Sequence, residues 1–153
     1  LDLAPADKLE LELFRVLLAE HGKIYTELLL SGPGLRRIHQ ALAQVEGTQA
    51  EDLTPAGITA AIATDPLCSR TVTLFCNLLG AACGSFLVSS GAYGGMYLAG
   101  GIVPRILPQL RASDFLSRLQ HKGVMFDILQ PVPVYALSAA SQPGLVGAAH
   151  APL

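Results

Sequence analysis

Met96-Tyr97-Leu98-Ala99-Gly100-Gly101-Ile102-Val103-Pro104 is the stretch of this sequence that decides the fold. Its first four residues have the composition of a short buried strand, two glycines follow as a tight turn, and the proline marks the start of a helix. A second strand is predicted at residues 133–138, after a helix that is capped by Ser113-Asp114 and stops at Gly123. Because a strand, helices and a second strand in this order form a parallel crossover unit, we predict a small parallel sheet covered by helices.

The rest of the chain is predicted to be mostly helical. Apolar residues recur at helical spacing, and glycine or proline marks several helix ends. The expected helices cover residues 7–20, 34–46, 54–64 and 71–89, and a small-residue helix covers 145–150. Phe86 is expected on the buried stripe of the longest helix. Residues 26–30 are predicted as a strand, and Ser31-Gly32-Pro33-Gly34 is predicted as a turn before the next helix.

The Gly100-Gly101 turn is the first candidate binding element. Glycines at the end of a strand let a ligand approach the main chain without interference from a Cβ atom. A helix that begins directly after them would present free amides to an anionic or polar ligand. A tight turn that binds nothing fits the same residues, so from these residues alone both interpretations stay open.

Glu27 is the second candidate, because it is an acidic residue next to the apolar run 28–30. A carboxylate accepts two or more hydrogen bonds, which suits the neighbouring hydroxyls of a sugar. The alternative is an edge residue that points into water. Ser31-Gly32-Pro33-Gly34 does not match a dinucleotide fingerprint, and no Gly-Lys-Ser/Thr phosphate loop follows it.

Composition limits the function classes. Hydrophobic residues make up 51% of the 153 residues and charged residues 14%, against about a quarter charged in most proteins. This excess predicts apolar surface that faces another lobe, another subunit or a membrane. The formal net charge is −2 without a basic stripe, so nucleic acid is not an expected partner. The cysteines and histidines lack metal-ligand spacing, so no metal site is predicted.

The uncharged segment 71–90 has an alternative interpretation as a membrane span. Polar residues inside it, and the absence of flanking basic clusters, favour instead a helix buried in a protein core. No membrane partner is therefore expected, and since the start at Leu1 has no basic signal region, we expect a cytoplasmic protein.

In combination, these pieces resemble the bacterial glucokinase family. Glu27 followed by Leu-Leu-Leu-Ser-Gly-Pro-Gly is similar to the family's glutamate and Leu-Ser-Gly-Pro-Gly motif. The stretch 91–105, Pro133-Val134-Tyr135 and the stretch 142–149 also resemble family segments. The likeness covers essentially the whole chain in the family's order.

The resemblance implies an α/β fold: the C-terminal lobe of an actin/hexokinase-like, ribonuclease H-like enzyme, helix-rich with a small sheet. It implies that the intact protein phosphorylates glucose with ATP and Mg²⁺, and that it forms a homodimer. Glu27 would contact the sugar, and the nucleotide-binding residues would be Gly94, Gly95, Gly100 and Gly101.

The departures from the family pattern are equally informative. The family's Asp-x-Gly-Gly-Thr phosphate loop, its catalytic aspartate and its Glu-Gly-Gly-His sugar motif do not occur in residues 1–153. The resemblance therefore implies that residues 1–153 are the C-terminal part, that an N-terminal lobe is its partner, and that this chain alone is inactive. Gly84-Ser85 stands where the family has Gly-Asn. A regulatory or degenerate kinase lobe is the alternative function, and a small membrane protein is a further one.

Overall fold

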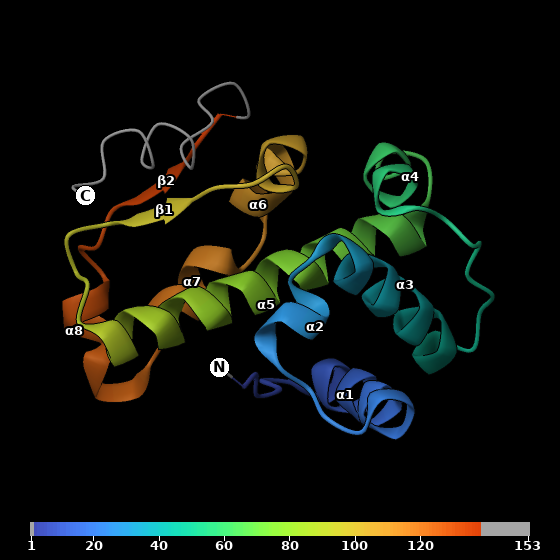
Figure 1. The fold of residues 1–153 in the computed structure, drawn as a ribbon, viewed down its shortest axis with the longest axis horizontal. Coiled ribbons are helices and arrows are strands. Elements are labelled where there is room, and N and C mark those ends of the chain that lie inside the picture. The colour runs from blue at the N-terminus through green and yellow to red at the C-terminus, as the bar shows by residue number, and fades with distance from the viewer. Residues whose placement is uncertain (1, 139–153) are drawn as a thin grey trace, which may run out of the picture.

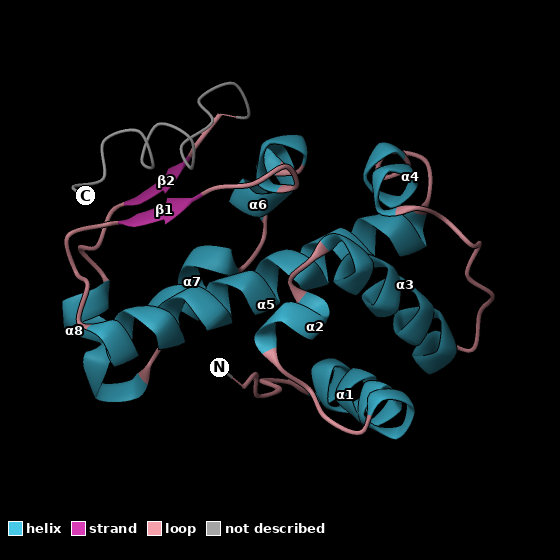
Figure 2. Cartoon of the chain, in the orientation of Figure 1, coloured by secondary structure: helices cyan, strands magenta, loops and turns pink. Residues whose placement is uncertain are grey.

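The computed structural model describes residues 2–138 as a helical layer beside a two-stranded sheet (Figure 1 and Figure 2). Two 3₁₀ turns, Val103–Arg105 and Gly123–Met125, join the later elements. In chain order the helices and strands are α1 Lys8–His21, α2 Thr26–Leu29, α3 Gly32–Glu46, α4 Pro55–Ala60, α5 Pro66–Ser90, β1 Met96–Leu98, α6 Leu107–Ala112, α7 Phe115–Gln120, α8 Phe126–Leu129 and β2 Val134–Ala136. The helix predicted at 145–150 lies outside the described residues.

The sheet confirms the predicted parallel crossover. β1 and β2 pair in parallel with Met96 opposite Val134 and Leu98 opposite Ala136, and α6, α7 and α8 form the connection. The prediction that β1 is buried was wrong for Tyr97, which is 61% exposed. Its side chain stacks on that of Tyr135 in the neighbouring strand, with ring centroids 5.0 Å apart. Alternate residues of a strand face opposite sides, so only one face of this thin sheet packs on the core.

Helix α5 runs through the middle of the described chain and packs against α3 and α7 (Figure 1). Its approach to α7 depends on two glycines. A Cβ atom at Gly80 would lie 2.2 Å from the carbonyl oxygen of Phe115, and one at Gly84 would lie 2.3 Å from that of Leu119. These positions therefore let two helix backbones pack in close contact.

The prediction that Phe86 is buried was wrong, since it is 51% exposed. The cause is helix geometry. Successive steps of four residues rotate the side-chain direction by about 40° each, because a helix has 3.6 residues per turn. Three such steps separate Leu74 from Phe86, so the phenylalanine has rotated away from the core and the neighbouring Leu87 is buried in its place.

Helix α5 is the one helix in residues 2–138 that is long and apolar enough to cross a membrane, and its most apolar 18-residue window has a mean hydropathy of 1.7. However, 61% of its most apolar window is buried inside the protein. Such burial is typical of a core helix, which passes the same test of length and composition.

Residues 26–30 were wrongly predicted as a strand: α2 is a short helix that begins after Tyr25. The predicted turn after it is also wrong, because α3 begins at Gly32 and Gly32-Pro33-Gly34 forms its first turn. Ser31 is the N-cap, and its Oγ accepts a hydrogen bond from the amide of Gly34 over 3.1 Å. Proline is well suited to a first helical turn, where an amide has no helical partner.

Candidate functional site

Glu27 lies in the first turn of α2, where it is exposed. It lines an open hollow of about 390 Å³ together with Tyr25, Thr26 and Leu30. The ammonium group of Lys23 lies 5.5 Å from the centre of the Tyr25 ring. Among residues 2–138, the Glu27 carboxylate has no hydrogen-bond or ion-pair partner. An acceptor that is unpaired within the described fold and borders a hollow is able to bind hydroxyl groups of a ligand.

The start of α3 packs against α2. Leu28 and Leu29 are buried, and a Cβ atom at Gly34 would lie 2.1 Å from the carbonyl oxygen of Leu29. The guanidinium of Arg37 donates a hydrogen bond to the carbonyl oxygen of Leu28 over 3.0 Å. Gly34, the second glycine of the Ser-Gly-Pro-Gly motif, is therefore required by the close contact between α2 and α3.

The Gly100-Gly101 turn borders a second hollow, of about 240 Å³, between the end of β1 and the start of α4. Its walls include Leu35 of α3 and Thr59 of α4. Gly100 has a φ of +115°, a conformation that favours glycine whatever surrounds it. Gly101 has no such φ, and a Cβ atom there would meet nothing within 4 Å. Within residues 2–138, the fold does not require glycine at 101, which makes it the better marker of a ligand surface.

The helix predicted to follow Gly101 directly is not observed there. The 3₁₀ turn Val103–Arg105 comes first, and α6 begins only at Leu107. In a helix that began at Pro104, the amide of residue 108 would donate to the carbonyl oxygen of Pro104. Pro108 has no amide hydrogen for this bond, so a regular helix is interrupted there. The Gly100-Gly101 turn therefore exposes main-chain groups, but the N-terminus of a regular helix does not follow it directly.

Gly94 and Gly95 lie at the opposite end of β1 from Gly100 and Gly101. Gly95 has a φ of +148°, whereas a Cβ atom at Gly94 would meet nothing within 4 Å. At about 3.3 Å per strand residue, the two glycine pairs are too far apart to contact the same ligand group. The structure brings Gly101 near α3 and α4 and leaves Gly94 and Gly95 outside that hollow.

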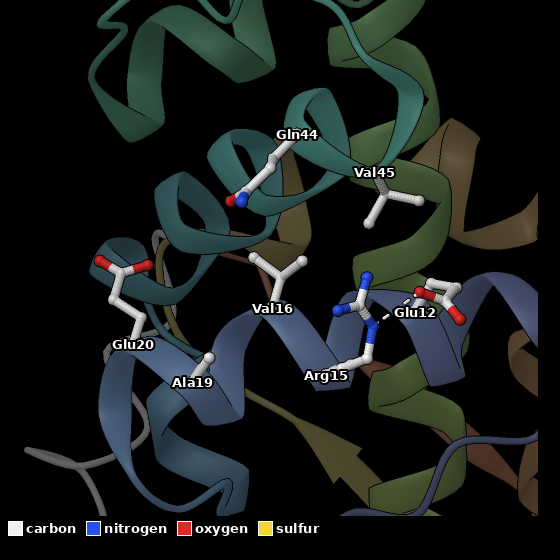
Figure 3. A pocket seen from close by; sticks show the side chains of 7 residues that line it. All are labelled: Glu12, Arg15, Val16, Ala19, Glu20, Gln44 and Val45. Atoms are coloured by element: carbon white, nitrogen blue, oxygen red, sulfur yellow. Dashed lines mark hydrogen bonds and ion pairs between the residues drawn. The ribbon is translucent and has the colours of Figure 1, made fainter.

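A further hollow, of about 560 Å³, is a groove between α1 and α3. Figure 3 shows Arg15 turned toward Glu12, and its Nε donates to the glutamate Oε2 over 2.9 Å. Both side chains are exposed, and the rest of the lining is Val16, Ala19, Glu20, Gln44 and Val45. No reactive group is concentrated there, so we do not assign chemistry to this groove.

Other reactive groups in the described part of the chain serve packing. Burial raises the pKa of the Cys68 and Cys76 thiols to about 12 and that of Cys83 to about 11, so these thiols are poor nucleophiles. Residues 2–138 hold no group of three or more His, Cys, Asp or Glu side chains able to bind a metal ion. We therefore derive no step through Mg²⁺ from this chain.

Ser85, the departure from Gly-Asn, has a partner inside the protein. The ammonium of Lys122 donates to Ser85 Oγ over 3.1 Å and to the carbonyl oxygen of Ala81 over 2.8 Å. Burial lowers the pKa of Lys122, and the nearby charge of Arg118 lowers it further. Sequence reasoning missed both Lys122 and Arg37, because nothing in the local sequence indicates a contact between distant elements.

Comparison with known proteins identifies the family. The glucokinase family model matches residues 1–152. The chain belongs to the glucokinase family. It is 42% identical over 139 residues to the glucokinase of Saccharophagus degradans, covering 90% of this chain and 43% of the relative. It is 38% identical over 155 residues to the glucokinase of Colwellia psychrerythraea, covering 97% of this chain and 47% of the relative.

The fold agrees with a solved glucokinase as well. The crystal structure of glucokinase from an Antarctic psychrotroph superposes with a TM-score of 0.86 at 34% sequence identity, covering 90% of this chain and 44% of that one. This confirms the predicted fold class, a helix-rich α/β lobe of a sugar kinase with a small parallel sheet. The chain spans under half the length of the curated glucokinases that it matches.

Proposed function

We propose that residues 1–153 form the C-terminal part of an ATP-dependent glucokinase, and that an N-terminal lobe supplies the phosphate loop and the catalytic aspartate. Membership of the glucokinase family supports glucose as the phosphoryl acceptor. The single observation that carries the role of this chain is Glu27, a carboxylate unpaired among the described residues at the edge of an open hollow.

In this proposal Glu27 accepts hydrogen bonds from hydroxyl groups of the sugar. A charge-assisted hydrogen bond is stronger than a neutral one, and the two oxygens of a carboxylate can accept from two hydroxyl groups at once, so Glu27 orients the sugar as well as binding it. Orientation matters because phosphoryl transfer depends mainly on positioning the acceptor hydroxyl in line with the γ-phosphate.

The hollow beside Gly101 takes the nucleoside of ATP. Its lining combines apolar side chains with the open main chain of the turn, which suits a flat base. Residues Gly34 and Leu35 are neighbours on α3, and they face α2 and the Gly101 hollow respectively. The first turns of α3 therefore connect the proposed sugar side to the proposed nucleoside side. Mg²⁺ would arrive with the nucleotide phosphates and be held outside the described residues.

The proposal extends to the assembly of the intact protein and to its location in the cell. The exposed apolar side chains, among them Leu11 and Val124, fit a chain that packs against an N-terminal lobe and against a second copy in a homodimer. A cytoplasmic location fits an enzyme that uses ATP and free glucose.

The test is glucose-dependent release of ADP from Mg-ATP by the purified full-length protein, compared with the chain of residues 1–153 alone. We expect turnover by the full-length protein and none by the chain alone. Absence of turnover in the full-length protein would contradict the proposal and favour a regulatory lobe. Turnover by residues 1–153 alone would contradict the proposed division of labour.

A further inference from the structure

Helix α2, which carries Glu27, cannot hold its own conformation. It has four residues, and forming the first turn of a helix costs more than its few hydrogen bonds return. Its last carbonyl groups, including that of Leu28, have no partner within the helix. Contacts from outside α2 must therefore fix the direction in which Glu27 points.

Arg37 supplies one of these contacts. Its Nη1 atom donates to the carbonyl oxygen of Leu28 over 3.0 Å, and the bond is partly buried. Leu28 follows Glu27 directly, so this bond fixes the peptide group between Leu28 and Leu29, one residue beyond the carboxylate-bearing residue. A charged donor that is shielded from water holds a carbonyl more strongly than a neutral donor does.

Helix α3, which carries Arg37, is rigid. Helix α3 has 15 residues, a Ser31 cap and buried core residues at Leu35 and Ile38. Gly34 and Arg37 are three residues apart and so lie on the same face of α3. Gly34 lets the main chain of α2 approach closely, and Arg37 then bonds to it.

We infer that Arg37 is a positioning residue for the hexose site: with Gly34 it seats α2 on α3 so that Glu27 stands at the edge of the hollow. This inference rests on the proposed role of Glu27 in sugar binding. It also gives the Ser-Gly-Pro-Gly motif a role in orienting the sugar contact, without contact between the motif and the ligand.

The neighbouring arginine provides a matched control. Arg36 lies on the same helix and is exposed, and its guanidinium is paired with Asp52 in the loop before α4. It makes no hydrogen bond to α2 among the residues described. Methionine is close to arginine in length and helix propensity, so Arg37→Met and Arg36→Met remove one guanidinium each with little change to α3 itself.

The experiment measures KM for glucose and for ATP in the full-length protein. We expect Arg37→Met to raise the glucose KM about fivefold to tenfold, which is less than the roughly tenfold to hundredfold of a charged hydrogen bond lost directly to the sugar, because Arg37 acts on the sugar only through Glu27. The KM for ATP should stay within about twofold in both variants. Arg37→Lys, which keeps a cationic donor, should recover part of the loss, and Arg36→Met should match the wild type.

A double-mutant cycle separates this role from general loosening of the fold. If Arg37 acts through Glu27, Arg37→Met should add nothing to the glucose KM once Glu27→Gln is present. Hydrogen exchange at the amide of Leu30, which bonds to the Thr26 carbonyl in α2, should accelerate in Arg37→Met and not in Arg36→Met.

The outcomes distinguish the inference from the function on which it rests. A Glu27→Gln variant with unchanged glucose KM would overturn both. A raised glucose KM in Glu27→Gln, with additive effects or no effect of Arg37→Met, would overturn the positioning role alone and leave the proposed function intact.

Discussion

His39 Nδ1 lies 3.1 Å from Thr71 Oγ1, in a fully buried contact between α3 and α5. The hydroxyl of Thr71 donates its one proton to the carbonyl oxygen of Leu67 over 2.8 Å, so it must accept from the imidazole. The Nδ1 atom of His39 therefore carries the proton. Its Nε2 atom is buried without a partner in the described structure. Protonation of Nε2 would place an unpaired charge in the core.

This contact predicts a loss of stability in mild acid. Burial lowers the pKa of His39 in the folded protein, although the charges of Asp65 and Glu51 oppose the shift in part. Below about pH 6.5 the unfolded chain binds a proton that the folded chain does not, so the free energy of unfolding falls until the pH reaches the folded pKa. The limit is about 1.4 kcal/mol per pH unit. Urea unfolding at pH values between about 7.5 and 5 measures this fall in the free energy of unfolding.

The control is a histidine on the surface. His39→Gln should flatten the pH dependence, whereas the same change at the exposed His121 should leave it in place. An unchanged slope in His39→Gln would mean that another group is responsible for the acid sensitivity.

Substitution by alanine should destabilise the protein far more at Gly34 than at Gly32. A Cβ atom at Gly34 would lie 2.1 Å from a main-chain oxygen, whereas one at Gly32 would lie 3.8 Å from Pro55, an ordinary contact. Gly34→Ala should cost about 3 kcal/mol or more in the free energy of unfolding, because backbone must move. Gly32→Ala should cost less than about 0.5 kcal/mol. Equal stabilities of the two variants in denaturant would show that α2 and α3 are not packed as described.

Glu10 and Arg118 form an ion pair between α1 and α7, with the Glu10 side chain fully buried and that of Arg118 19% exposed. Glu10 also accepts a hydrogen bond from the amide of Ala6 over 2.8 Å. Removing one partner of a buried pair costs about 3–5 kcal/mol, so Glu10→Gln should be strongly destabilising. The exposed pair of Glu12 and Arg15 is the comparison, and Glu12→Gln should cost under about 1 kcal/mol. Thermal unfolding of both variants tests this difference.

Gly100 and Gly101 are expected to have different roles, one in the fold and one in nucleotide binding. Gly101→Val should raise the KM for ATP about tenfold in the full-length protein, because the new side chain would occupy the proposed nucleoside hollow. Its stability should be unchanged, since open space surrounds the position. Gly100→Ala should instead destabilise the fold by about 1–2 kcal/mol, because its φ of +115° is strained for other residues. Normal ATP affinity in a folded Gly101→Val variant would remove the nucleoside assignment.

Local signals predicted much of this fold. Helix α1 lies within one residue of the predicted range 7–20 at each end, with Asp7 as its N-cap and Gly22 as its C-cap, because capping depends on residues within one turn. Helix α2 was missed because four residues give no periodicity, and tertiary contacts determine their conformation. Contacts such as Arg37 to Leu28 join separate elements, so no local pattern could reveal them. Residue chemistry singled out Glu27 and the Gly100-Gly101 turn but left two interpretations of each open. The family resemblance favoured the binding interpretation of both and added Gly94 and Gly95.

The role of Glu27 is the central claim, and one steady-state experiment tests it most directly. The KM for glucose is measured in the full-length protein carrying Glu27→Gln, with Glu12→Gln as the control for a surface glutamate. Loss of a charge-assisted hydrogen bond costs about 1.5–3 kcal/mol, so we predict a glucose KM raised about tenfold to a hundredfold with the KM for ATP unchanged. A glucose KM equal to that of the wild type would contradict the account.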